Sequence, residues 1–216
     1  KDSVTLNIDS ADDGMDIDGR KANKITVREN SSLNIKAVSE GITVSEISES
    51  VEILVKDNGT LTGDGEDECI YIADTDNATV TFTDHAKVSL VNNDEEGIYI
   101  DALENETVTV SGNADVYIDV VEQRVEAETV IIDGGSLKAH SKKTYDAIAA
   151  TDVTVNAGKL IVSSEDDYAI KADSIKITGG TLVAGNNTTE YPVSDYRSLL
   201  KRITESALLS PKNTLF

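Results

Sequence analysis

The chain has 216 residues, enough for one sizeable domain or an array of repeats, and 39% of them are hydrophobic, enough for a packed core. Forty Asp and Glu residues against 19 Lys and Arg give a formal net charge of -21. Such a surface repels nucleic acid and anionic membranes and suits divalent cations, so we expect neither nucleic-acid binding nor membrane insertion. The single cysteine, Cys69, excludes an internal disulfide framework.

A short turn followed by Leu or Val recurs along the chain. The copies are ENSSL (29–33), DNGTL (57–61), DHAKV (84–88), GNADV (112–116), DGGSL (133–137), NAGKL (156–160) and TGGTL (178–182). Their last residues are spaced by 28, 27, 28, 21, 23 and 22 positions. Before each turn stands an alternating, β-branched segment such as ITV or VTF, which is typical of a strand with one buried face. The turn's own Leu or Val opens a further strand.

A third strand-like segment begins with a small residue followed by an apolar one. It reads GMDID (14–18), GITVS (41–45), CIYIA (69–73), GIYID (97–101), AIAAT (147–151) and AIKAD (169–173), with RVEAE (124–128) as a weaker copy. Three short strands in a period of 21 to 28 residues predict an all-β, single-stranded parallel β-helix (β-solenoid) of about seven three-strand coils. A β-sandwich is the alternative, but its strands share no such repeat and need hairpin signals that are scarce here.

The character of the sequence changes near Pro192. SDYRSLLKRITESALLSP places Tyr196, Leu199, Leu200, Ile203, Ala207 and Leu208 on one helical face, with Ser194 as N-cap and Pro211 after the end. An open solenoid end exposes unpaired strand edges, so we expect this short helix to cap the last coil. The predicted domains are a parallel β-helix over 1–190 and a C-terminal helical cap over 191–216.

Acidic residues recur at fixed places in the repeat. Aligned on the small residue, they stand just before the third strand and at its end. The candidate metal ligands are Asp12, Asp13, Asp18, Asp67, Glu68, Glu95, Glu96, Asp101, Asp146, Asp166, Asp167 and Asp173. Stacked coils bring equal positions within ~5 Å, where two carboxylates repel by about 1 kcal/mol even in water.

Cations that bridge the coils would relieve this repulsion. Calcium accepts six to eight oxygen ligands in irregular geometry, whereas His and Cys are too scarce for a zinc or iron site. We therefore favour Ca²⁺ as the cofactor. The alternative is a solvated acidic edge that keeps a rod soluble.

Three stretches carry a family resemblance: DDGMDID (12–18), DAIAATDVTVNAGKL (146–160) and EDDYAIKADSIKITGGTLVAG (165–185). They resemble a family of bacterial cell-surface carbohydrate-binding domains. Members of that family are calcium-binding right-handed parallel β-helices, similar in shape to pectate lyases, that bind cellulose and acidic polysaccharides such as polygalacturonate. The resemblance implies an extracellular or cell-surface location and a polysaccharide partner. The opening KDSVTL, without Met or an apolar signal segment, is typical of a piece of a longer precursor.

Three functions stay open at this point. The first is a non-catalytic module for acidic (pectin-like) or cellulosic glycans, with Tyr71 and Tyr99 as a candidate ligand platform or an ordinary outward ladder. The second is an adhesin or structural surface rod. The third is a pectate-lyase-like enzyme with Lys171 as base, but a lysine among acids is more often a salt bridge, and its raised pKa would oppose that role. We expect a non-enzymatic binder, with Cys69 buried in the small-residue column.

Overall fold

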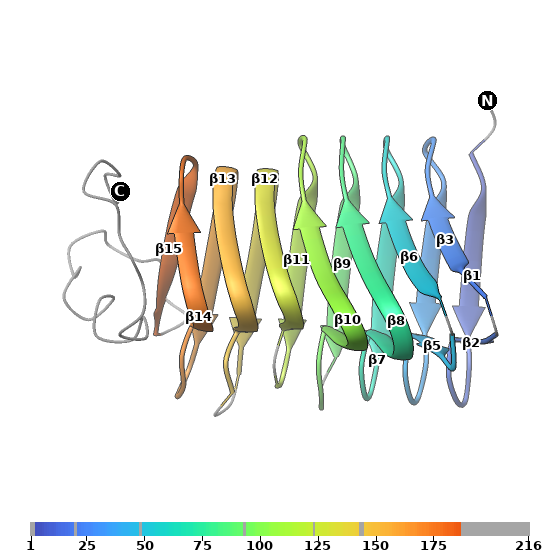
Figure 1. Ribbon diagram of the computed structural model, residues 1–216. Coiled ribbons are helices and arrows are strands. Elements are labelled where there is room, and N and C mark those ends of the chain that lie inside the picture. The colour runs from blue at the N-terminus through green and yellow to red at the C-terminus, as the bar shows by residue number, and fades with distance from the viewer. Residues whose placement is uncertain are drawn as a thin grey trace.

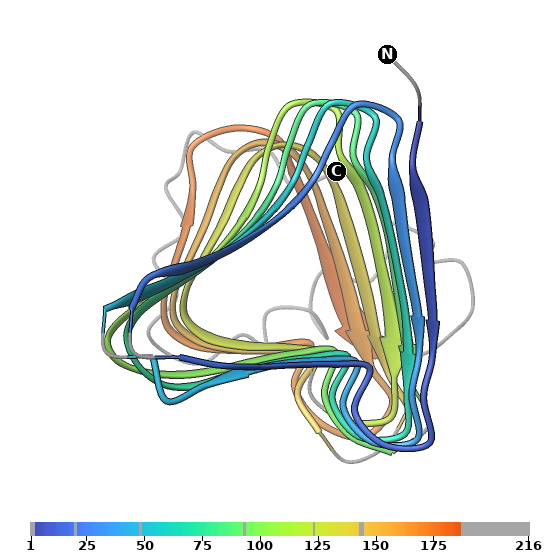
Figure 2. The same ribbon diagram turned by 90° about the vertical axis from the view of Figure 1, so that its right-hand side faces the viewer.

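A computed structural model describes residues 3–19, 21–47, 49–92, 94–122, 124–142 and 145–186. Its strands wind into a parallel β-solenoid, seen side-on as a rod in Figure 1 and end-on as a triangle in Figure 2. Every strand pairing is parallel. The all-β solenoid predicted from the sequence is confirmed.

Three stacked faces make up the triangle. The first face contains β1 (Thr5–Asp9), β4 (Ser32–Lys36), β7 (Thr60–Gly65), β9 (Lys87–Asn92), β11 (Asp115–Val120), the ends of β12 (Val125–Ser141) and β13 (Ile148–Ser164), and β15 (Thr181–Asn186). The second contains β2 (Met15–Asp18), β5 (Ile42–Ser45) and the beginnings of β8 (Ile70–Phe82), β10 (Ile98–Val110), β12, β13 and β14 (Ile170–Ile177). The third contains β3 (Asn23–Val27), β6 (Ser50–Val55) and the later parts of β8, β10, β12, β13 and β14.

Apolar side chains of equal repeat position lie one above another inside the triangle. On the second face the stack is Met15, Ile42, Ile70, Ile98, Val125, Ile148 and Ile170. All members after the first are buried. These seven layers among the described residues span about six full turns, in agreement with the expected coil number. Alternation places Tyr99 outside and Ile98 and Ile100 inside, as β-strand geometry requires.

The turns between the third and first faces come in two lengths. Four residues lie between Val27 and Ser32, and the turns that begin after Val55, Phe82 and Val110 have the same length. In these turns the second residue, Glu29, Asp57, Asp84 or Gly112, has φ between 56° and 61°. Later turns have three residues, as between Ile132 and Ser136.

The third residue of the short turns is always glycine. Gly135, Gly158 and Gly180 have φ of 63°, 73° and 73°. A Cβ on Gly135 would lie 2.3 Å from the carbonyl oxygen of Ala114 in the coil before it. The short turn therefore needs glycine both for its left-handed backbone and for close stacking, which explains the Gly-Gly and Ala-Gly pairs of the last three repeats.

One coil breaks the small-residue column with an arginine. Gly14, Gly41, Cys69 and Gly97 precede Arg124 in this column, as the backbone hydrogen bonds between successive coils show. The Arg124 side chain is fully buried, and none of its guanidinium nitrogens has a hydrogen-bond partner among the described residues. Burial lowers its pKa to about 9, and the nearby Asp119 only partly opposes this. This substitution is why RVEAE matches the other copies weakly.

The predicted cap over 191–216 lies outside the described residues. Among the residues that are described, no helix is long and apolar enough to cross a membrane. Cys69 is buried in the small-residue column as expected, and burial raises the pKa of its thiol to about 12, so it is a packing residue.

Two adjacent isoleucines of β12 test the stacking. Ile132 is fully buried inside the solenoid, whereas Ile131 faces outward and is half-buried. Ile132→Ala should lower the free energy of unfolding by about 2–5 kcal/mol, because it opens a cavity in a continuous apolar column. Ile131→Ala should cost less than about 1 kcal/mol. Equal losses in chemical denaturation would contradict this inward–outward assignment.

Candidate metal centre at the acidic corner

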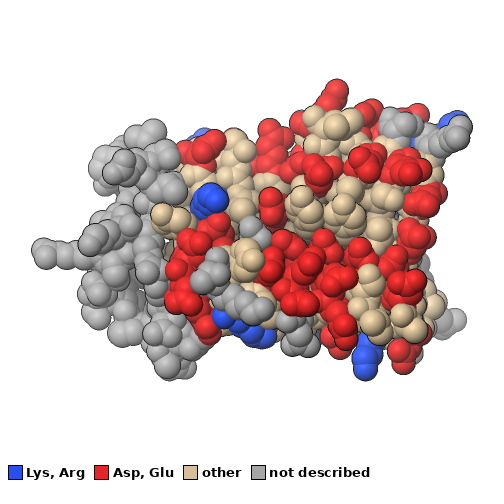
Figure 3. Space-filling model, turned by 90° about the horizontal axis from the view of Figure 1, so that it is seen from below, with Lys and Arg blue, Asp and Glu red and all other residues tan. Residues whose placement is uncertain are grey.

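One edge of the triangle collects acidic side chains. We call it the acidic corner: the loops that join the first face to the second, at residues 10–13, 37–40, 65–68, 94–96, 120–122, 145–146 and 165–168. Figure 3 shows this side of the rod, where Asp and Glu form a nearly continuous band along its length.

Backbone hydrogen bonds fix the register of these loops. The Gly14 amide donates to the Glu40 carbonyl at 2.9 Å, and the Gly41 amide donates to the Glu68 carbonyl at 2.8 Å. The Cys69 amide donates to the Glu96 carbonyl in the same way at 3.1 Å. Because the ladder uses the acids' own carbonyls, the backbones that carry successive carboxylates are held one coil apart.

Three of the predicted ligands converge at the middle of the corner. Carboxylate oxygens of Glu68, Glu95 and Glu96, from two neighbouring loops, all lie within 4.8 Å of one another. Glu68 is buried, and the other two are half-buried. At this separation two full charges repel by about 1 kcal/mol in water and by about 3–4 kcal/mol near a protein surface.

The cluster resists ionisation. Burial raises the pKa of Glu68 to about 7, and repulsion from Glu95, Glu40 and Asp67 adds to the shift. Burial likewise raises the pKa of Glu96 to about 7, together with repulsion from Glu122, Glu68 and Glu95. The pKa of Glu95 is raised by the same causes, burial first and neighbouring acids second. A bound cation would remove this penalty, because it favours the ionised form.

The donor set fits calcium. Three carboxylates offer up to six hard oxygens, and water can complete a shell of six to eight. The cluster contains no nitrogen or sulfur ligand, which disfavours zinc. Magnesium demands near-ideal octahedral geometry and retains its waters, which suits an irregular carboxylate group less well.

A second acidic group lies further along the same corner. Asp146 is 5% exposed, and no hydrogen-bond donor of the described residues reaches its Oδ1. Its Oδ2 lies 3.7 Å from Lys171 Nζ. Burial and repulsion from Asp167 raise the pKa of Asp146, and Lys171 partly offsets them. The unpaired Oδ1 is a further place for a cation or water to bind.

The remaining predicted ligands do not join these two groups. Asp12 and Asp13 stand on the first coil, and Asp67 and Asp166 lie on the loops beside the two groups. Asp18, Asp101 and Asp173 lie at the opposite end of the second-face strands. Asp101 follows Glu96 by five residues of extended chain, about 16 Å, so one ion cannot contact both.

Three contributors were not among the predicted ligands. Glu40 accepts a hydrogen bond from the Ser39 hydroxyl and lies next to Asp13, which raises its pKa in addition to burial. Glu122 and Glu126 raise the pKa of Glu96 from the following coil. The weak RVEAE copy concealed these two, because Arg124 stands where the other coils carry a small residue.

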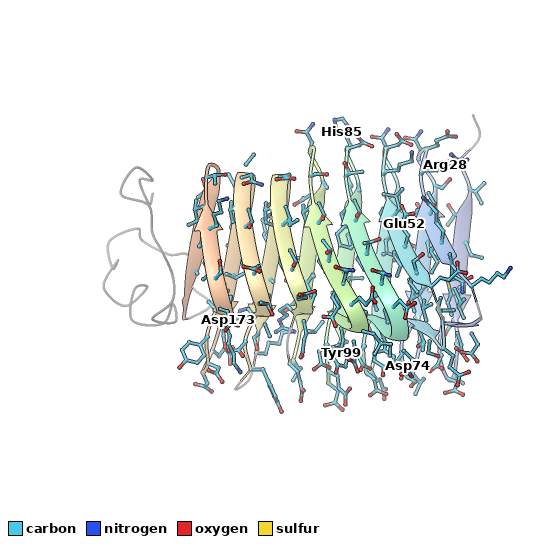
Figure 4. All side chains as sticks on the ribbon, in the orientation of Figure 1. Arg28, Glu52, Asp74, His85, Tyr99 and Asp173 are labelled. Carbon is cyan, nitrogen blue, oxygen red and sulfur yellow. The ribbon has the colours of Figure 1, made fainter. Side chains whose placement is uncertain are left out.

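Two tyrosines stack beside the carboxylates. The rings of Tyr71 and Tyr99 lie 5.6 Å apart with an interplanar angle of 30°. Burial raises the pKa of both tyrosines. Repulsion from acidic neighbours adds to the shift, most strongly from Glu68 for Tyr71 and from Glu126 for Tyr99. Figure 4 shows Tyr99 at the lower edge of the rod, opposite the turn that carries His85. The pair is an aromatic stack next to the metal-binding candidates.

No protein-family model matches the chain, and comparisons with curated proteins and with solved structures gave no match either. Function must therefore be argued from the chemistry of the corner.

The cluster predicts an unusual pH dependence without metal. Unfolded glutamates ionise near pH 4.5, whereas Glu68 and Glu96 keep their protons up to about pH 7 in the fold. Their contribution to the free energy of unfolding is complete below the pKa of the unfolded glutamates, and it is lost as the pH rises through the pKa that they have in the fold. In EDTA, the free energy of unfolding should therefore fall by about 1–3 kcal/mol between about pH 5 and about pH 8 because of these groups.

The double variant Glu68→Gln/Glu96→Gln should flatten that slope. Glu104→Gln is the control, because Glu104 is exposed on the same coil outside the corner. Thermal and chemical denaturation across the pH range measure the effect. If the free energy of unfolding of the double variant depends on pH as steeply as that of the parent protein, these two glutamates do not cause the pH dependence.

Proposed function

We propose that the protein is an extracellular calcium-binding β-helix module that binds polysaccharide without catalysis. Its ligands are acidic, pectin-like glycans or cellulosic glycans. The observation that carries the proposal is the convergence of carboxylate oxygens of Glu68, Glu95 and Glu96 within 4.8 Å of one another at the acidic corner.

Charge limits how an acidic glycan could bind there. The chain has a formal net charge of -21, so a uronate carboxylate approaching the corner is repelled. A calcium ion held by the three glutamates would offset two of their three charges and would offer open coordination positions to such a carboxylate. Glu68, the most buried of the three, would anchor the ion, while Glu95 and Glu96 face the ligand side.

The tyrosine pair supports a sugar ligand. Tyr71 and Tyr99 present stacked rings on successive coils beside the carboxylates. Aromatic faces of this kind can support the apolar face of a sugar ring, and the interaction needs no charge. This part of the surface suits both neutral and acidic glycans, which is why cellulosic ligands stay in the proposal.

The weak calcium affinity expected of the site supports an extracellular location at a bacterial cell surface. A site built from three carboxylates, two of them only half-buried, resembles the weaker class of calcium sites, with dissociation constants of about 10⁻⁴ to 10⁻³ M. Such sites fill where calcium is abundant, outside the cell. The catalytic alternative has less support, because Nζ of Lys171, the candidate base, lies 3.7 Å from Oδ2 of Asp146 and forms an ion pair with it.

Affinity electrophoresis through polygalacturonate gels tests the proposal. We expect retardation in millimolar calcium and free migration in EDTA. Glu68→Gln/Glu96→Gln should migrate freely in both, whereas the control Glu104→Gln should behave as the parent protein. Calcium-dependent retention that survives the double substitution would place the metal elsewhere. Absence of retention by pectin gels and by insoluble cellulose would favour a structural rod, and unsaturated products absorbing in the ultraviolet would favour a lyase.

A further inference from the structure

The rod has a step at the edge opposite the acidic corner. Val110 pairs with Ile132 and Asp115 pairs with Ser136, so four residues on one coil stand beside three on the next. The longer turn, 111–114, therefore projects beyond the shorter turn that contains Gly134 and Gly135. Figure 1 shows the difference, because the loops above β3, β6, β9 and β11 rise higher than the tops of β12 and β13.

A groove of about 730 Å³ lies in this step. The projecting turn, with Asn113, forms one wall, and the first-face strands of β12 and β13 form the other. Its floor is made by Gly134, Gly135 and Gly158, so no side chain covers the backbone there. The volume lies within the usual range for small-ligand sites.

Two lysines line the groove on the same outward face. Ser136 pairs with Lys159 and Lys138 pairs with Ile161, which makes Lys138 and Lys159 diagonal neighbours on adjacent strands. Diagonal neighbours have Cα atoms about 7–8 Å apart, so two long ammonium side chains can reach one carboxylate between them.

The two carboxylates of the groove are already engaged. Asp133 Oδ1 accepts a hydrogen bond of 2.6 Å from Asn156 Nδ2, and Asp115 Oδ1 lies 4.0 Å from Lys138 Nζ. The Lys159 side chain is exposed and has no ion-pair partner among the described residues. On a chain of net charge -21, this groove offers a positive group that is free to bind an anion.

Distance isolates the groove from the acidic corner. The six residues of β11 run from the groove, at Asp115, to the corner, at Val120. The five steps from Asp115 to Val120 span about 16 Å, about two Debye lengths at physiological ionic strength. The field of the glutamate cluster is therefore largely screened at Lys159. The labelled side chains in Figure 4 mark the same separation, because His85, whose ring lies 3.5 Å from Asn113, is at the upper edge and Tyr99 is at the lower.

We propose that this groove is a second, metal-independent binding site for the carboxylate of an acidic saccharide. Lys138 and Lys159 bind the carboxylate, the glycine floor lets the sugar ring approach the backbone, and Asp133 and Asn113 face its hydroxyl groups. The ligand class rests on the proposed function, but the residues and the absence of any metal requirement are independent of the acidic corner.

Calorimetric titration with a short oligogalacturonide in EDTA tests the groove. We expect the parent protein to bind and Lys138→Gln/Lys159→Gln to lose at least about tenfold in affinity, which corresponds to about 1.4 kcal/mol. Lys87→Gln is the matched control, because Lys87 holds the same column as Lys159 on the first face but lies outside the groove lining. The parent protein should bind a carboxyl-reduced oligosaccharide no more tightly than Lys138→Gln/Lys159→Gln binds the oligogalacturonide.

The outcomes separate this proposal from the calcium site. Binding in EDTA that Lys138→Gln/Lys159→Gln retains at the strength of the parent protein would overturn the groove as the site. No binding in EDTA, with calcium-dependent retention on polygalacturonate intact, would overturn the groove and leave the acidic corner standing. If the parent protein binds neither the oligogalacturonide in EDTA nor polygalacturonate in calcium, both the groove and the acidic corner are overturned as binding sites. Melting temperatures of the variants confirm that they are folded.

Discussion

In-register parallel stacking governs everything else in this molecule. Each coil exchanges backbone hydrogen bonds with the coils on both sides of it, so residues at equal repeat positions are held about 5 Å apart along the rod. Inside the triangle this constraint is favourable, because it builds continuous columns of isoleucine, valine and leucine that exclude water. At the acidic corner the same constraint is unfavourable, because it stacks carboxylates that would separate if they could.

The cost at the corner is what links the fold to function. Glu68 and Glu96 have pKa values near 7 because burial and repulsion both oppose their ionisation. A solvated acidic edge would need neither the burial of Glu68 nor the convergence of three carboxylates on one point. A cation turns the penalty into binding free energy, and an ion held at such a corner can in turn attract an anionic glycan. In the groove at the opposite edge, Asp115 and Asp133 are engaged and Lys159 has no ion-pair partner among the described residues, which is the basis for the proposed direct binding of a carboxylate there.

Much of this architecture can be predicted from the sequence, because each coil of a solenoid repeats the same pattern of residue types. The turn motifs, the buried columns, the outward direction of Tyr99 and the convergence of Glu68 with Glu95 and Glu96 all follow from aligning the repeats. Other features do not, because they depend on differences between neighbouring coils. Glu126 and the buried Arg124 sit in the coil that departs most from the repeat, and the lysine groove exists only because a four-residue turn adjoins a three-residue turn.

The central claim is that a cation lies between the carboxylates of adjacent coils. The most direct measurement is an anomalous difference map from a crystal grown in millimolar calcium, with data collected at a long wavelength. The account predicts a peak among Glu68, Glu95 and Glu96, within about 2.3–2.6 Å of their oxygens, and no such peak in crystals of Glu68→Gln/Glu96→Gln. A map with no peak at this position, from calcium-grown crystals in which the three side chains are well ordered, would contradict it.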